Sequence, residues 1–278
     1  MFHAASFSGP VEIREGLSPR RSLSHVLFDF DGTLSWIRHG WPNLMCDLFM
    51  PHCPLLPGAT EADWRNVLLE EILLLNGESS VHQVRRCCHL IRERGGRILE
   101  PGPLLSEYLR RLDHLIAERI ERIRAGTVDD FIIRGARAFL ETLRSRGLTL
   151  AILSGTIEHR VKEEAELLGL AEFFGNHIYG STANGAVFSK RAVLERLLRQ
   201  EHIDGQNLLS FGDGPVEIAL TRRNGGLAVA IASDEEVNGS GKLAPYKLRG
   251  LRAAGADIIL PDFQDAQALT GVILGPPC

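Results

Sequence analysis

The sequence has no apolar run long enough to cross a membrane and no large excess of charge of either sign. A membrane-spanning helix needs about 20 consecutive apolar residues. The first residues also lack the basic start and the apolar stretch of a signal peptide. A formal net charge of −4 provides no basic surface for nucleic acid or for an anionic membrane. We therefore expect a soluble, cytoplasmic protein that binds neither nucleic acid nor membrane.

Cysteine is also scarce, and its spacing argues against a disulfide scaffold. The five cysteines are odd in number and follow no CxxC pattern; they are Cys46, Cys53, Cys87, Cys88 and Cys278. A disulfide framework or a zinc site has regular spacing, so we expect reduced thiols. The remaining composition, with 44% hydrophobic and 24% charged residues over 278 positions, is that of an ordinary globular protein with a sizeable core.

Helix-like and strand-like segments alternate from Phe131 onward, which is typical of a parallel sheet covered by helices. Short apolar segments predict six strands, at residues 26–30, 148–153, 177–179, 208–211, 228–231 and 257–260. Helical periodicity predicts helices over residues 136–146, 158–168 and 191–200, and an Asn184-Gly185 turn precedes the last of these. The fold class is therefore α/β, with a doubly wound parallel sheet.

Residues 39–129 follow a different pattern, with helical spacing and no convincing strand. Thr60 begins a capping-box sequence, Ser80 is a helix cap, and Pro103 can start a third helix. We expect this block, which we call the helical insertion, to interrupt an α/β core made of residues 23–38 and 130–278. Residues 1–22 are rich in Pro, Gly, Ser and Arg, and we expect them to be partly unordered.

The most informative segment is residues 26–34, which read VLFDFDGTL. Side chains alternate along a strand, so Asp29 and Asp31 lie on the same side of the backbone. Open α/β sheets bind ligands at the carboxyl ends of their strands. One carboxylate there can act as a nucleophile while the other moves protons. The simpler alternative is an ordinary Asp-Gly turn with no catalytic role. The pattern of two aspartates after an apolar strand is too specific for us to prefer that alternative.

Two further segments bring polar groups to the same sheet edge. Residues 150–156 read LAILSGT and end a predicted strand at Ser154, whose hydroxyl can donate to a phosphoryl oxygen. Lys190 precedes a predicted helix, where a cation is unfavourable unless it faces an anion. Alone, Ser154 would be read as a helix cap and Lys190 as a solvated surface charge.

A third acidic position follows the strand predicted at residues 208–211. Residues 208–214 read LLSFGDG and deliver Asp213 to the sheet edge, and Glu217 follows on the next predicted helix. Asp29, Asp31 and Asp213 together form an all-oxygen set of the kind that Mg²⁺ prefers.

These four motifs, in this order, resemble those of the haloacid dehalogenase (HAD) superfamily. They are the DFDGT segment with Asp29 and Asp31, then Ser154-Gly155, Lys190, and the GDGPVE segment with Asp213 and Glu217. The helical insertion resembles the C1-type cap of that superfamily, so that the likeness covers residues 23–262. The resemblance implies a Rossmann-like core and an Mg²⁺-dependent enzyme similar to phosphoglycolate phosphatases.

The resemblance also implies roles for individual residues. Asp29 would be the nucleophile that forms an aspartyl-phosphate, and Asp31 would be the general acid and then the general base. Mg²⁺ would be held by Asp29, Asp213 and the backbone carbonyl of Asp31. The residues that would bind the phosphoryl group are Thr33, Ser154, Gly155 and Lys190. Glu217, where the family usually has Asp, would bind a metal-bound water or orient Lys190.

Two features narrow the choice within the superfamily. Asp31 favours phosphate esters over haloacids, because dehalogenases need no proton for the leaving group. No lysine precedes Lys162, which excludes the Schiff-base chemistry of phosphonatases. We expect hydrolysis of a small phosphorylated metabolite. A phosphotransferase or mutase acting on a sugar phosphate and a catalytically idle module that binds a phosphorylated ligand stay open as alternatives.

Substrate identity and oligomeric state are not readable from the sequence. Specificity is expected to depend on the helical insertion and on residues 34–41, where Trp36, Arg38, His39 and Trp41 could line the entrance. Arg38 would pair with a second anionic group of the substrate or lie in solvent. His159, just after the second motif, would touch substrate or be solvated on its helix.

Overall fold

The computed structural model describes residues 7–54, 58, 60–181 and 189–275, so the expected Asn184-Gly185 turn and Cys278 lie outside the described residues. In this part of the chain a seven-stranded sheet has the order β1-β7-β6-β5-β2-β3-β4. Its strands are β1 (Glu12–Ile13), β2 (His25–Phe28), β3 (Thr149–Ile157), β4 (Ile178–Ser181), β5 (Leu208–Gly212), β6 (Leu227–Ile231) and β7 (Ile258–Leu260). All neighbours are parallel except β1 and β7. The predicted α/β fold is confirmed.

The edge strand β1 was not predicted from the sequence. It pairs antiparallel with β7, and the backbone N–H of Arg14 donates to the carbonyl oxygen of Asp257 at 2.8 Å. Residues 12–14, which belong to the segment expected to be partly unordered, therefore pair with the edge of the sheet in the structure. Two residues are too short to show the alternation that identifies a strand in a sequence.

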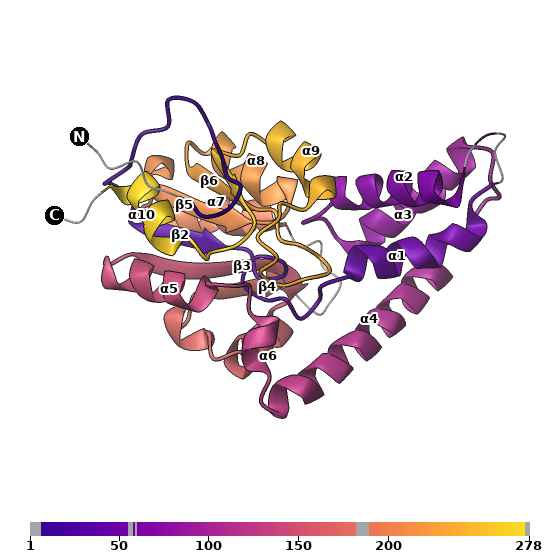
Figure 1. Cartoon of the computed structure of the whole chain (residues 1–278), viewed down its shortest axis with the longest axis horizontal. Coiled ribbons are helices and arrows are strands. Elements are labelled where there is room, and N and C mark those ends of the chain that lie inside the picture. Colours follow the sequence, from indigo (N-terminus) through magenta and orange to yellow (C-terminus); the bar gives the residue numbers. More distant parts are fainter. Residues whose placement is uncertain (1–6, 55–57, 59, 182–188, 276–278) are drawn as a thin grey trace.

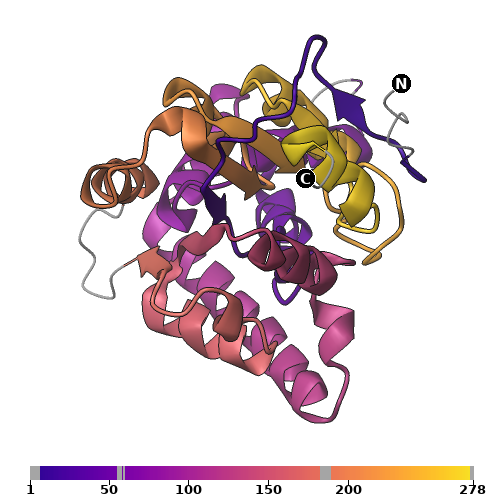
Figure 2. The same ribbon diagram turned by 90° about the vertical axis from the view of Figure 1, so that its left-hand side faces the viewer.

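Helices cover both faces of the sheet (Figures 1 and 2). The helices of the core are α5 (Ala136–Ser145), α6 (Glu158–Leu167), α7 (Lys190–Gln200), α8 (Pro215–Arg223), α9 (Pro245–Ala253) and α10 (Ala266–Leu274). Helices α5, α6 and α10 share one apolar core with alternate residues of the central strands, including Phe28 and Phe211. Helices α7, α8 and α9 pack against the opposite face. Burial on both faces explains why the central strands are continuous apolar runs.

The central strands that lead to the site are held by stacked aromatic rings. Phe28 on β2 stacks on Phe211 of β5 with ring centroids 4.9 Å apart, and Phe139 of α5 meets Phe211 edge-on at 5.2 Å. Aromatic pairs in these arrangements add to the stabilisation from apolar burial. This packing fixes the ends of β2 and β5, and with them the residues that follow these strands.

The helical insertion forms its own apolar core beside the sheet edge. It contains α1 (Trp41–Phe49), α2 (Glu61–Leu74), α3 (Ser80–Glu93) and α4 (Pro101–Arg124). Helices α1, α2 and α3 lie at the end of the molecule opposite the two termini, and α4 runs from there back toward α6 (Figure 1). The predicted capping box is present, because Thr60 Oγ1 accepts from the backbone N–H of Asp63. Of the described helices, none is long and apolar enough to span a membrane.

Candidate active site

A pocket of about 160 Å³ lies where the carboxyl ends of β2 and β3 face the helical insertion. Its core side is lined by Asp29, Asp31, Arg38, Ser154, Gly155, Thr156 and Lys190. Its insertion side is lined by Trp41, Asn76, Gly77, Glu78, Ser79, Ser80, Gln83, Tyr108 and Leu112. The pocket therefore joins the predicted catalytic positions to residues of α1, α3, α4 and the α2–α3 loop.

Asp29 is fixed by the backbone around it. Its own N–H donates to the carbonyl oxygen of Phe211 at 2.8 Å, and its Oδ1 accepts from the N–H of Phe30 at 2.9 Å. Gly32 turns the chain with φ of +73°, and a Cβ at this position would overlap the carboxylate of Asp213. Only glycine therefore allows the first motif to approach Asp213 so closely.

Lys190 lies inside the site rather than on the surface. Its Nζ is 3.0 Å from Asp29 Oδ1 and 3.3 Å from Glu217 Oε2. Burial alone would lower the pKa of Lys190, but the carboxylates of Asp29 and Glu217 raise it above its usual value. Lys190 is therefore a permanent cation. Because it engages Oδ1, and no described residue donates to Asp29 Oδ2, that oxygen remains open to the pocket.

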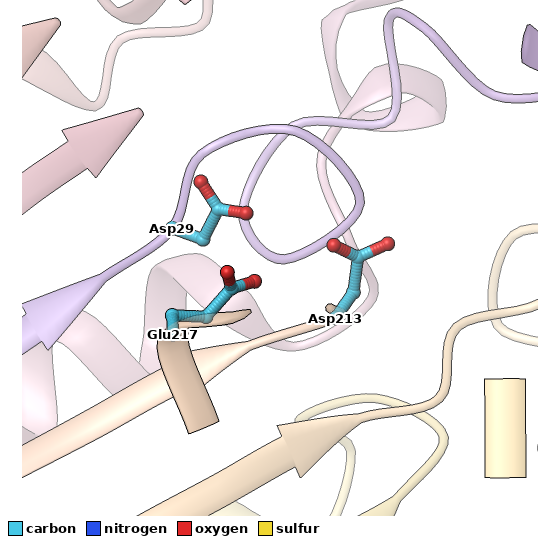
Figure 3. A group of neighbouring side chains, drawn as sticks. All are labelled: Asp29, Asp213 and Glu217. Carbon is cyan, nitrogen blue, oxygen red and sulfur yellow. The ribbon is translucent and has the colours of Figure 1, made fainter. Parts of the chain in front are cut away.

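Three buried carboxylates meet at the predicted metal position. Asp29, Asp213 and Glu217 each place one oxygen within 4.8 Å of the others (Figure 3). Burial raises the pKa of Asp213 to about 6, and nearby Glu217 adds to the rise. Burial also raises the pKa of Asp29 well above its ordinary value. Both shifts come mainly from burial, and the neighbouring carboxylates add to them.

Lys247 on α9 is a member of this site that the sequence analysis missed. Its Nζ is 2.8 Å from Asp213 Oδ2, 2.7 Å from Glu235 Oε1 and 3.0 Å from Ser233 Oγ, and the side chain is buried. The chain has only four lysines among its 31 basic residues. Because lysine is so rare in this arginine-rich sequence, Lys247 could have been singled out as a candidate site residue.

The charges of this cluster do not balance. The carboxylates of Asp29, Asp213, Glu217 and Glu235 share the two ammonium groups of Lys190 and Lys247. Two negative charges are left over in a buried region. A divalent cation with a preference for carboxylate oxygen fits this excess, and Mg²⁺ is such a cation.

Asp31 is held apart from the three-carboxylate group. Its Oδ1 accepts from Arg38 Nη1 at 2.7 Å, and its Oδ2 accepts from Thr156 Oγ1 at 2.8 Å. Arg38 is itself buried, and both of its terminal nitrogens donate to Glu164 of α6, at 2.5 and 2.7 Å. Arg38 is therefore neither solvated nor free for a substrate group, which are the two roles that the sequence suggested.

The predicted phosphate-binding residues are only partly brought together. Ser154 and Gly155 line the pocket beside Lys190, and Ser154 Oγ accepts from the N–H of Thr156 at 3.0 Å. Thr33 does not line the pocket. It is fully buried, and its Oγ1 has no hydrogen-bond partner in the described part of the chain.

Of the expected entrance residues, Trp41 lines the pocket, whereas Trp36 and His39 do not. The rings of Trp36 and His39 stack with centroids 3.4 Å apart, and His39 Nε2 is 2.9 Å from Arg119 Nη2 of α4. These two side chains therefore join the core to the helical insertion. His159 is exposed on α6, which agrees with its solvated reading.

Comparison with known proteins identifies the family of this chain. A family model described as haloacid dehalogenase-like hydrolase matches residues 23–225. A phosphoserine phosphatase of Archaeoglobus fulgidus is 27% identical over 160 residues, covering 53% of this chain and 45% of that protein. The chain thus spans less than half the length of this curated relative.

Solved structures with low sequence identity share the fold. A haloacid dehalogenase-like protein of unknown function from Agrobacterium tumefaciens has a TM-score of 0.62 and 20% identity, over 90% of this chain and 98% of that one. A predicted phosphoglycolate phosphatase from Haemophilus somnus has a TM-score of 0.57 and 17% identity over the same shares of the two chains. A putative beta-phosphoglucomutase from Thermotoga maritima has a TM-score of 0.53 and 14% identity, over 90% and 100%. With the family model matching most of its length, the chain belongs to the haloacid dehalogenase-like hydrolases.

Proposed function

We propose that this protein is an Mg²⁺-dependent phosphatase that hydrolyses a small phosphate monoester through a phosphorylated Asp29. The observation that carries the proposal is the open Oδ2 of Asp29, in a pocket whose other walls supply a buried cation and a second carboxylate. The similarity to a phosphoserine phosphatase supports the same class of reaction.

The residues present fit Mg²⁺. The proposed ligands are Asp29, Asp213 and the backbone carbonyl of Asp31. Glu217 of α8 is the third carboxylate of the group formed with Asp29 and Asp213. A bound Mg²⁺ would supply positive charge that screens the phosphoryl oxygens from these carboxylates. Lys247 holds Oδ2 of Asp213, so that Oδ1 of Asp213 would be available as a metal ligand.

The first half of the reaction is a transfer to Asp29. Asp29 Oδ2 attacks phosphorus and the bond from phosphorus to the ester oxygen breaks, so that the phosphoryl group becomes bound to Asp29. Asp31 gives its proton to the departing ester oxygen, which leaves as an alcohol. In this proposal the phosphoryl oxygens are held by three groups that line the pocket, which are Lys190, the hydroxyl of Ser154 and the backbone at Gly155.

The second half returns the enzyme to its starting state. Asp31, now ionised, takes a proton from a water molecule as that water attacks phosphorus. The bond from phosphorus to Asp29 breaks, inorganic phosphate leaves, and Asp31 is protonated again. Arg38 and Thr156 hold the carboxylate of Asp31 in place for both proton transfers.

The test is phosphate release from a panel of phosphomonoesters, in Mg²⁺ and in EDTA, with Asp29→Asn and wild type in parallel. We expect release that requires Mg²⁺ and that the folded variant lacks. Release that is equal in EDTA, or equal in Asp29→Asn, would contradict the proposal.

Transfer to a sugar hydroxyl is the second candidate. Asp31 can accept a proton from a sugar hydroxyl as well as from water, and a putative beta-phosphoglucomutase has a similar fold. Phosphoryl label that moves from a phosphosugar into a second sugar product, with little free phosphate, would favour the transferase.

A further inference from the structure

The two sides of the pocket differ in charge, and this bears on the alcohol part of the substrate. Among the described residues that line the insertion side there is no lysine or arginine. The polar side chains there are hydroxyls and amides, and the single charged group is the carboxylate of Glu78. Residues 55–57, 59 and 182–188, which lie outside the described part of the chain, contain no lysine or arginine either.

The one arginine that lines the core side is already neutralised. Arg38 Nη1 donates to both Asp31 and Glu164, and Nη2 donates to Glu164. Glu164 alone balances the charge of this buried guanidinium, and Asp31 engages one of its nitrogens as well. A carboxylate from a substrate would therefore add uncompensated negative charge.

The amino end of α3 does not supply the missing positive charge. Glu78 lies directly before the cap residue Ser79, where a carboxylate interacts favourably with the helix dipole. Its Oε2 is also 3.5 Å from His82 Nδ1. An anionic group of a substrate would meet this carboxylate on entering the pocket.

Tyr108 provides a neutral contact in the same wall. Its side chain is 2% exposed and lines the pocket, and no described residue forms a hydrogen bond with its hydroxyl. The hydroxyl is not among the fully buried polar atoms that lack a partner in the described residues, so it is accessible from the pocket, and a ligand that pairs with it gains specificity. Gln83, whose Nε2 donates to the carbonyl oxygen of Leu75 at 3.2 Å, lies in the same wall.

We propose that the leaving group of the substrate is an uncharged alcohol with further hydroxyls, such as a polyol or a sugar, and that the pocket disfavours alcohols that carry a carboxylate. The inference rests on the proposed phosphatase function and specifies its substrate class. It separates this chain from the substrates that the names of its relatives contain, since phosphoserine and phosphoglycolate both carry a carboxylate.

A matched pair of esters tests the inference. Glycerol 3-phosphate and 3-phosphoglycerate differ only in a hydroxymethyl group replaced by a carboxylate, and methyl phosphate has neither group. With wild-type protein and Mg²⁺, we expect kcat/KM for glycerol 3-phosphate to exceed that for 3-phosphoglycerate by about tenfold or more. Equal values, or a preference for 3-phosphoglycerate, would overturn the inference.

Two variants locate the effect. Glu78→Gln should reduce the preference for glycerol 3-phosphate over 3-phosphoglycerate, whereas Glu118→Gln on the exposed surface of α4 should preserve it. Tyr108→Phe should lower the ratio of kcat/KM for glycerol 3-phosphate to that for methyl phosphate by about three- to tenfold. If neither Glu78→Gln nor Tyr108→Phe changed its ratio of kcat/KM values, the contacts assigned to Glu78 and Tyr108 would be contradicted.

The outcomes separate the inference from the function on which it rests. Mg²⁺-dependent hydrolysis of methyl phosphate together with a preference for 3-phosphoglycerate would overturn the inference and leave the phosphatase in place. Hydrolysis of none of the three esters would overturn both.

Discussion

The core side and the insertion side of the pocket achieve different tasks with different chemistry. On the core side, Asp29 and Lys190 are buried charges whose Oδ1 and Nζ atoms lie 3.0 Å apart, and they follow a strand and begin a helix respectively. On the insertion side, neutral polar groups such as Tyr108 and Gln83 come from helices with a separate apolar core. Fixed charges suit the reaction at phosphorus, and neutral contacts suit the choice of alcohol.

Apart from Asp29→Asn, the largest effect of a substitution on the core side is expected at Lys190. Lys190→Met should lower kcat by about a hundredfold to a thousandfold, because a preorganised cation at the phosphoryl group is lost. Steady-state phosphate release measures this. Lys162→Met, on the exposed face of α6, is the matched control, and an equal loss in both variants would show that charge at this position is not what matters.

Removal of Lys247 should act on stability and not only on rate. Lys247→Met leaves Asp213 and Glu235 without their cation, which should cost about 3 kcal/mol of unfolding free energy in EDTA. Added Mg²⁺ should raise the melting temperature of the variant more than that of wild type, since it supplies the missing charge. Equal Mg²⁺ shifts for the two proteins would refute the charge balance derived for this cluster.

The contact between the two sides can be tested at Gly77 of the α2–α3 loop. Its φ is +92°, and a Cβ would lie 2.7 Å from Glu217 Oε2 and 2.9 Å from Val216 Cβ. Gly77→Ala should lower the unfolding free energy by about 2 kcal/mol and should also lower kcat.

Gly126→Ala is the control for backbone strain in that experiment. Gly126 has φ of +109°, and a Cβ there would have no neighbouring atom within 4 Å, so this variant carries the backbone cost alone, about 1 kcal/mol. Urea unfolding of both variants gives the difference. An equal loss of unfolding free energy in Gly77→Ala and Gly126→Ala would mean that the α2–α3 loop does not pack closely against Glu217.

The smallest effect is expected at the junction formed by His39. Burial lowers the pKa of His39 to about 4, and the neighbouring guanidinium of Arg119 favours the same direction. In the unfolded chain the imidazole of His39 takes up a proton near pH 6.5, whereas in the folded chain it stays neutral down to about pH 4. The free energy of unfolding therefore falls as the pH is lowered from about 6.5 to about 4. His39→Gln should reduce this loss by on the order of 1 kcal/mol in urea unfolding at pH 7 and pH 5. An unchanged pH dependence would contradict the neutral His39.

The sequence predicted most of the sheet and the positions at its edge for a physical reason. Asp29 and Asp213 each follow a short apolar strand, and the carboxyl ends of neighbouring parallel strands meet at one edge. Convergence of these side chains therefore depends on local pattern and general topology. The helix caps at Thr60 and Ser79 are likewise local signals, although the cap at Ser79 lies one residue before the predicted position.

Contacts between distant segments could not be predicted in this way. Lys247 reaches Asp213 from α9, a helix that the sequence pattern did not indicate, and Glu164 reaches Arg38 across 126 positions of the chain. No periodicity links such residues. The roles assigned to Thr33, Ser154, Lys190 and Glu217 from the family resemblance stay predictions, and so does the division of the chain into core and insertion.

The most direct test of the account is to trap the phosphorylated enzyme. Wild type and Asp29→Asn would be mixed with a ³²P-labelled monoester and Mg²⁺, quenched in acid within one turnover, and mapped by peptide. The account predicts label on the peptide that contains Asp29 in wild type and none in the variant. Rapid turnover of the ester with no label on that peptide would contradict it.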